Sequence, residues 1–205
     1  MADTFGKTSA GGGEGALTTG RKIGCRFQLT KKGTVTKLVA YVKGIANNKP
    51  MKAAIYSDNA GEPDKLLVSS GEVLIKDVAQ WQDFPLTKTL NPGYYWLALT
   101  CEVDSKFYYQ SGVSNQTVRN ADWWPDGWHD PFLSDADGRT WFAIEVSIYA
   151  VYTPTPETSE LTIPVVTGGT TSPSPGIYTH TTGSTVTVTA YPDEGYVFDH
   201  WIYNG

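Results

Sequence analysis

The stretch "NADWWPDGWHDPFLSDADGRTWF" at residues 120–142 holds the side chains best suited to bind a ligand. It contains six aromatic residues, five carboxylates and one of the three histidines of the chain. A flat exposed ring stacks on the apolar C–H face of a sugar while polar neighbours bond its hydroxyls, and exposed aromatic clusters mark interaction surfaces. We therefore expect a carbohydrate site with three stacking rings and five flanking residues, namely Trp123, Trp124 and Trp128 with Asp126, His129, Asp130, Tyr109 and Arg119.

The same aromatic residues also suit a second role, as a lid that closes one open end of a β-sandwich. Phe132 is expected to be the internal anchor of such a lid. Trp123 and Trp124 are adjacent, so burying both rings in one direction is awkward. At least one ring of that pair, or Trp128, should therefore be exposed, and the two roles stay open side by side.

Motifs of known catalytic sites are missing from the sequence. It has no G-x-S-x-G elbow, no phosphate loop and no H-E-x-x-H motif. The three histidines are far apart, and Cys25 and Cys101 lack the spacing of a zinc site. Three aspartates between residues 122 and 130 are spaced by four, but on an irregular loop that spacing fixes no geometry, and Asp is typical of tight turns. We therefore expect a binding module and no enzyme.

Oxygen-rich turns leave a structural calcium ion as the one cofactor to consider. "DADG" at residues 135–138 is similar to the start of a calcium loop, which needs a carboxylate at its twelfth position. Counted from Asp135, the twelfth residue is Val146, so a helix–loop–helix calcium site is excluded. The weak candidates that remain are aspartates on expected sandwich loops, namely Asp58, Asp64, Asp135 and Asp137.

Apolar and polar residues alternate with a period of two, whereas helical periodicity is hard to find. In "KIGCRFQL", for example, Ile23, Cys25 and Phe27 share one face. About eight short strands separated by turn signals every ~8–12 residues predict an all-β antiparallel sandwich. Cys25 and Cys101 both fall on the apolar face of their strands, so they form either a disulfide or two buried free thiols.

The charge of the chain is divided unevenly. All 16 Lys and Arg precede residue 154, whereas residues 154–205 carry five acids and no Lys or Arg. Without a cluster of cations to displace counterions from phosphate, a nucleic-acid partner is excluded. No apolar run approaches the ~20 residues of a membrane span. Pro and Thr alternate in "YTPTPETSE", which predicts a stiff linker at residues 154–160, followed by strands at 184–192 and 195–205.

Seven segments, from "FGKTS" through "NADWWPDGWHDPF" to "SIYAVY", occur in order along residues 1–153. Through them this part of the chain resembles a family of bacterial extracellular β-sandwich domains that often occur beside glycoside hydrolases and cell-surface anchors. The resemblance implies a jelly-roll-like sandwich with no established catalytic chemistry. It also implies that "DG" at 126–127 and "DPF" at 130–132 give the aromatic loop a fixed shape. The matching segments, in order, are "FGKTS", "RKIGCRFQLTKKGTVTKLVAYV", "AAIYSDNAGEPDKLL", "NPGYYWLALT", "YYQSG", "NADWWPDGWHDPF" and "SIYAVY".

Residues 161–205 begin with "LTIPVVTGG" and contain "GSTVTVTAYPDEGYVFDHW". Through these segments they resemble the short β repeats of internalin-type (Listeria–Bacteroides-like) bacterial surface proteins. The matching segments are "LTIPVVTGGTTSPSPGIY", "GSTVTVTAYPDEGYVFDHW" and the final "NG". Such repeats continue past that Asn-Gly into a further strand, so we expect an incomplete module with an unpaired edge. On this expectation the segment from Tyr196 to Tyr203 pairs with another chain or is poorly ordered.

Together these features predict a non-catalytic carbohydrate-binding module of a larger secreted or cell-surface protein. Its expected partners are a polysaccharide or glycan and the other modules of a longer chain. The first residues, "MADTFGKTS", lack the basic and apolar segments of a signal peptide. We therefore expect either that the protein is made without one or that this sequence begins after it and Met1 was added. The alternative is a structural or adhesive module, on a cell surface or a viral appendage, that has protein partners and no glycan site.

Overall fold

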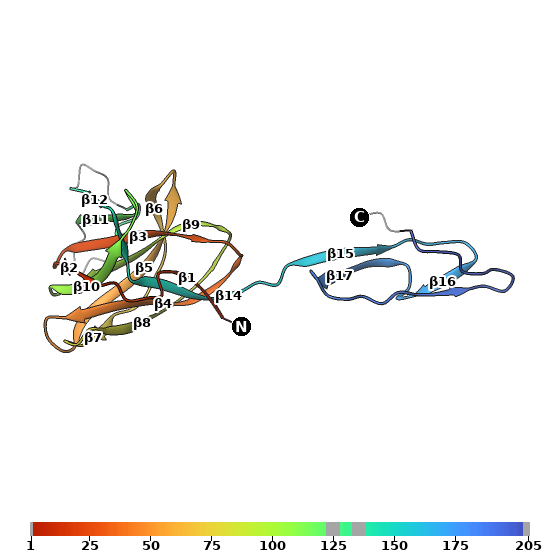
Figure 1. The fold of residues 1–205 in the computed structure, drawn as a ribbon, viewed down its shortest axis with the longest axis horizontal. Helices are drawn as coiled ribbons and strands as arrows, with labels where there is room; N and C mark the ends of the chain where they lie inside the picture. Colours follow the sequence, from red (N-terminus) through yellow and green to blue (C-terminus); the bar gives the residue numbers. More distant parts are fainter. Residues whose placement is uncertain (1, 122–127, 133–137, 203–205) are drawn as a thin grey trace. The chain divides into compact units, whose positions relative to one another are not determined.

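The computed structural model describes residues 2–121, 128–132 and 138–202, and the chain divides into two compact units, Met1–Thr155 and Pro156–Gly205. Within the described residues every regular element is a strand and none is a helix (Figure 1). The expected all-β, antiparallel architecture with a small second module is therefore confirmed. The linker expected at residues 154–160 is in large part strand, because Pro154 ends β14 and β15 begins at Thr158.

The N-terminal unit consists of two antiparallel sheets. The first sheet contains β1 (Asp3–Gly6), β2 (Gly13–Leu17), β4 (Gly33–Gly44), β8 (Gln80–Leu90), β10 (Ser105–Ser111), β13 (Ile144–Val146) and β14 (Ile148–Pro154). The second sheet contains β3 (Arg21–Leu29), β5 (Lys49–Asn59), β6 (Glu62–Ser69), β7 (Val73–Ile75), β9 (Gly93–Cys101), β11 (Thr117–Ala121) and β12 (Thr140–Phe142). The long strand β4 pairs with β8 along one edge. Along its other edge it pairs first with β14 and then, near its C-terminal end, with β10.

The main core lies between the two sheets and is supplied by alternate side chains of their strands. On β3 it includes Ile23, Phe27 and the thiol of Cys25, as the alternation predicts. Cys25 and Cys101 are both free, so of the two alternatives the disulfide is not formed. The Cys101 Sγ instead donates a hydrogen bond to the carbonyl oxygen of Leu17 at 3.2 Å.

The C-terminal unit consists of two separate two-stranded sheets. β15 (Thr158–Ile163) pairs with β17 (Gly176–Thr181), and β16 (Gly169–Ser172) pairs with β18 (Thr189–Pro192). The strand expected at 184–192 is reduced to β18, and residues 195–202 form no strand, contrary to the alternation. Only Ile163 and Thr171 are buried among the described residues of this unit. Residues 193–202, which follow β18, pair with no strand in the described part of the chain.

Candidate functional site

The structure describes one part of the aromatic loop that the sequence singles out. Trp123, Trp124 and Asp126 lie outside the described residues, as do the calcium candidates Asp135 and Asp137. Residues 128–132 are described and include Trp128, His129, Asp130 and the expected anchor Phe132. These four residues therefore show whether the described part of the loop is packed as a lid or exposed as a binding surface.

Beneath residues 128–132 lies a second apolar core, on the outer face of the second sheet. Phe132 is only 3% exposed and meets Tyr56 of β5 edge to face, with 5.0 Å between ring centroids. Strands β5, β9 and β11 supply the residues beneath Phe132, because alternate side chains of these strands point to the outer face of the sheet. Phe132 is thus the internal anchor predicted for a lid. The members of this outer core are Ala54, Tyr56, Trp96, Ala98, Val118 and Phe132, with Leu66, Trp128 and Trp141 packed against them.

Three hydrogen bonds tie residues 129–132 to strands β5 and β6. The Tyr56 hydroxyl donates to the carbonyl oxygen of His129 at 2.9 Å. The backbone N–H of Leu66 donates to Asp130 Oδ1 at 3.0 Å, and that of Phe132 donates to the carbonyl oxygen of Asp64 at 2.7 Å. His129 thus contributes its backbone, and Asp130 an oxygen, to fixing the lid.

Trp128 is half-buried and packs against the outer core. Its ring meets that of Tyr56 edge to face, with centroids 6.0 Å apart and planes inclined at 70°. Its Nε1 is buried and has no hydrogen-bond partner among the described residues. This arrangement is the packing role that the sequence left open. The proposed platform of Trp123 and Trp124 stays a prediction.

The two residues expected to extend the loop surface lie elsewhere. Tyr109 belongs to β10 of the first sheet, and its ring packs beside Phe107 against the main core, with 6.0 Å between centroids. Arg119 lies on β11, one residue after Val118 of the outer core, so it occupies the opposite face of the strand. Its guanidinium lies over the ring of Phe142, 5.4 Å from the centroid. Neither residue is among those of the outer core against which Trp128 packs.

Asp58, another calcium candidate, is already bound to cationic and N–H donors. Its oxygens accept hydrogen bonds from Arg26 Nε at 2.7 Å, Arg26 Nη2 at 2.9 Å and Trp96 Nε1 at 2.8 Å. Burial alone would raise the pKa of Asp58, but these bonds and that of the Gly61 amide hold it below its ordinary value. A guanidinium fills the place a cation would take. No group of three His, Cys, Asp or Glu suited to a metal occurs in the described part of the chain.

A different aromatic cluster, which does not form a continuous run in the sequence, lies on the outer face of the first sheet. We call it the aromatic face; its members are Tyr41 of β4, Trp81 of β8, Tyr108 of β10 and Tyr149 of β14. Tyr41 pairs directly with Trp81 across the strands, and their centroids are 5.2 Å apart. Tyr41 lies 5.0 Å from Tyr108, and Trp81 lies 5.3 Å from Tyr149. All four rings are half-buried, so each presents an edge or a face to solvent.

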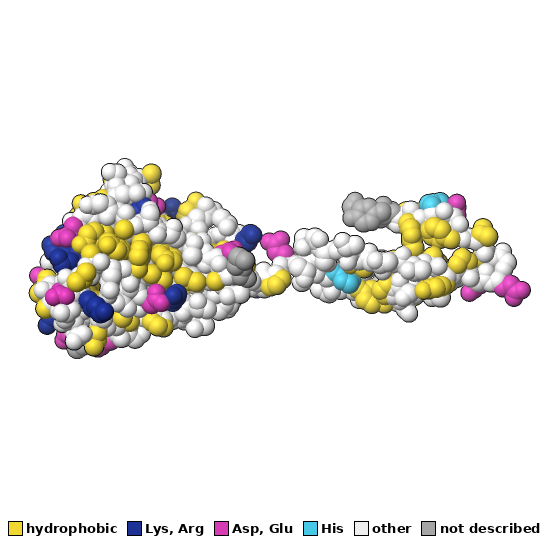
Figure 2. Space-filling model, turned by 60° about the horizontal axis from the view of Figure 1, so that its bottom comes forward, with side chains coloured by type: hydrophobic (Ala, Val, Ile, Leu, Met, Phe, Trp, Pro, Cys, Tyr) yellow, Lys and Arg dark blue, Asp and Glu magenta, His cyan; other side chains and the backbone are white. Residues whose placement is uncertain are grey.

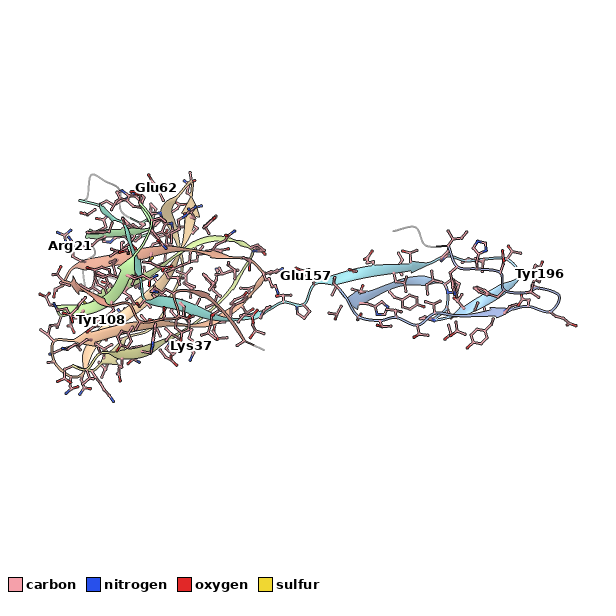
Figure 3. The ribbon with its side chains drawn as sticks, viewed as in Figure 1. Arg21, Lys37, Glu62, Tyr108, Glu157 and Tyr196 are labelled. Carbon is pink, nitrogen blue, oxygen red and sulfur yellow. The ribbon has the colours of Figure 1, made fainter. Side chains whose placement is uncertain are left out.

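The position of the aromatic face follows from strand alternation. On β4, Ala40 and Val42 point into the main core, so Tyr41 between them must point outward. Figure 2 is turned toward the side of the N-terminal unit where β4 and β8 lie, and it shows hydrophobic side chains gathered across that surface. In Figure 3, Tyr108 and Lys37 of the first sheet lie on one side of this unit, and Glu62 of the second sheet lies on the other.

Charged groups border the aromatic face at both ends. At one end Lys37 Nζ and Asp83 Oδ2 form an ion pair of 2.6 Å. At the other, Glu14 accepts a hydrogen bond from the Tyr108 hydroxyl at 3.0 Å and forms an ion pair with Lys106 at 3.3 Å. The hydrogen bonds of Tyr108 and Lys106 lower the pKa of Glu14, which is therefore ionised at neutral pH. Rings and charges thus adjoin on one surface.

The C-terminal unit has an apolar groove of about 440 Å³. Its walls include Ile163, Val166, Tyr191, Phe198 and Trp201. Phe198 and Trp201 are about half exposed, at 49% and 54%. Exposed apolar patches often mark interaction surfaces in other proteins.

Comparison with known proteins identifies the C-terminal unit alone. No helix in the described residues is long and apolar enough to cross a membrane. Searches of curated proteins and of solved structures found no match to the chain. Residues 159–205, in contrast, match the family model described as the divergent InlB B-repeat domain, which agrees with the internalin-type resemblance and begins two residues earlier. The C-terminal unit of this all-β chain is thus similar to a divergent InlB B-repeat.

Proposed function

We propose that the chain is a non-catalytic carbohydrate-binding module and that the aromatic face of the first sheet is its binding surface. The observation that carries this proposal is the cluster of Tyr41, Trp81, Tyr108 and Tyr149, four half-buried rings from four different strands. Each ring offers apolar area to the C–H face of a sugar, and the tyrosine hydroxyls offer hydrogen bonds to its hydroxyls. Paired strands hold the rings in place, so little entropy is lost on binding.

The described part of the aromatic loop supports a structural role instead. Phe132 and Trp128 pack on the outer core, and an oxygen of Asp130 already accepts a backbone hydrogen bond. A ring that is packed edge to face on the protein has less surface to offer a sugar. The loop remains a second place for the same function, through Trp123 and Trp124, and the two places predict different mutants.

Binding to insoluble polysaccharides and to a soluble glycan panel tests the function. Trp81→Ala should weaken binding about 5- to 30-fold, because losing one stacked ring costs about 1–2 kcal/mol. Tyr94→Ala is the matched control, since Tyr94 is 44% exposed but belongs to β9 of the second sheet. Trp123→Ala combined with Trp124→Ala should leave binding unchanged. Absence of binding across the panel would refute the function, and loss of binding only in the loop variant would refute the site.

The setting of the module is part of the same proposal. The match to the divergent InlB B-repeat supports a bacterial protein built from several modules, placed outside the cell or on its surface. Such a location suits a protein that binds polysaccharide. Fractionation of cells that express the full-length gene, followed by detection of this chain on the cell surface or in the medium, tests it; a purely cytoplasmic signal would contradict it.

A structural or adhesive module with a protein partner is the second candidate function. It is favoured by the C-terminal groove and by Val197, which is 90% exposed beside it. Residues 154–205 carry five acids and no Lys or Arg, so a second copy would be repelled and a basic protein segment attracted. Unpaired strands bind such segments by adding a strand. Capture of basic, apolar peptides that is lost in Trp201→Ser would support this function, and equal capture by the variant would oppose it.

A further inference from the structure

Two lysines face each other directly at one end of the aromatic face. Lys43 of β4 and Lys106 of β10 are cross-strand partners, so their side chains leave the sheet on the same side. Both lie two residues from a ring of the face, Lys43 from Tyr41 and Lys106 from Tyr108, and therefore share its outward direction. Like charges directly opposite each other destabilise a sheet. Such a pair needs an anion to offset it.

The protein supplies one carboxylate to this pair. Glu14 lies 3.3 Å from Lys106 and also accepts the Tyr108 hydroxyl. Lys43 forms no ion pair within the described part of the chain, but its charge also helps to lower the pKa of Glu14. Among these three described groups, the two ammonium groups of Lys43 and Lys106 exceed the single carboxylate of Glu14 by one positive charge. The opposite end is neutral, because Lys37 and Asp83 form an ion pair of 2.6 Å.

We propose that the aromatic face binds an acidic saccharide, with the sugar ring against Tyr41 and Tyr108 and its carboxylate beside Lys43 and Lys106. The proposal rests on the carbohydrate-binding function and specifies its ligand class. A uronic acid carries the two features that the surface complements, an apolar ring face and a negative charge at the ring's edge. A sulfated sugar presents similar chemistry, so the test includes both anions.

The test compares oligogalacturonate with its methyl ester, which keeps the sugar ring and removes the charge. By isothermal titration at low salt, the acid should bind the intact chain about fivefold more tightly than the ester, the scale of an exposed ion pair. Lys43→Gln should abolish that difference, because it should weaken binding of the acid about fivefold more than binding of the ester. Lys37→Gln is the matched control, because Lys37 is a partly exposed lysine of the same strand that already has a partner, and it should retain the difference. Salt should weaken binding of the acid alone.

Each outcome separates the ligand class from the function. Equal binding of acid and ester, or an acid preference that survives Lys43→Gln, would overturn the acidic-ligand proposal and leave carbohydrate binding intact. Binding of dextran sulfate, a sulfated sugar, and of two uronic-acid ligands, oligogalacturonate and alginate oligomers, is measured in parallel. If only dextran sulfate binds, the carboxylate assignment is overturned in favour of a sulfated sugar. Failure of every acidic and neutral saccharide to bind would overturn both proposals. Far-ultraviolet circular dichroism confirms that each lysine variant is folded.

Discussion

Replacement of Phe132 by Ala tests whether the aromatic loop is a lid with its own core. Phe132 is 3% exposed, lies 5.0 Å from the ring of Tyr56, and has the Lys22 ammonium 4.3 Å from its centroid. Removing a buried Phe ring costs about 3–5 kcal/mol, from lost burial and from the cavity left behind. For a domain of this size that cost lowers the melting temperature by about 10 °C.

The measurement is urea unfolding of the whole chain, followed by near-ultraviolet circular dichroism, which reports on packed aromatic rings. Phe132→Leu should lie between the wild type and the alanine variant, because it fills part of the cavity. Val113→Ala is the control, since Val113 is 70% exposed and its loss should change the free energy of unfolding by less than about 0.5 kcal/mol. If Phe132→Ala is as mild as this control, the ring is not an anchor and the loop does not function as a lid.

Further predictions concern acid stability, thiol reactivity and the exposed tail. The pKa of Asp58 lies below its ordinary 3.8, so its pairing with Arg26 stabilises the fold above that pH and is lost as the pH falls through the lowered value; Asp58→Asn should be less stable than wild type at pH 7, by a margin that shrinks below pH 3.8 in acid titrations of the unfolding free energy. Burial raises the pKa of Cys25 and of Cys101 to about 12, so iodoacetamide at pH 8 should label neither thiol in the folded chain and both in urea, by mass spectrometry; labelling of the folded chain would contradict the buried placement. Trp201→Ser should reduce binding of a hydrophobic dye to the C-terminal unit and leave the melting temperature of the sandwich unchanged; an equal dye signal would show that this surface is not accessible.

Alternation along single strands was enough to predict the sandwich, and it failed where a second core covers a sheet. On β3, Ile23, Cys25 and Phe27 are buried on the predicted inner face. Lys22, which the same alternation places on the opposite face of β3, is fully buried because it lies beneath the lid, with its ammonium over Phe132. Where a loop packs over the outer face of a sheet, both faces of the strand beneath it are buried. Alternation of polar and apolar residues along that strand does not reveal such a covering loop.

The candidate site was harder to predict because strand pairing creates it. Tyr41, Trp81, Tyr108 and Tyr149 are tens of residues apart, and each looks like an ordinary strand aromatic in its own segment. They become neighbours only through the pairing of β4 with β8, β10 and β14. The sequence instead led to a predicted carbohydrate site at residues 120–142, because aromatic residues that are close in sequence can be recognised without knowing the fold. The outward parity of Tyr41 between core residues was the one signal available.

The lid also makes the two outer faces of the sandwich different from each other. It occupies the aromatic part of the second sheet's outer face, while the first sheet keeps its four rings at the surface. If the proposed function holds, a polysaccharide fibre would contact one broad side of the N-terminal unit, and the other side would face away from it. Copies bound along one fibre would then all expose the outer face of the second sheet to solvent.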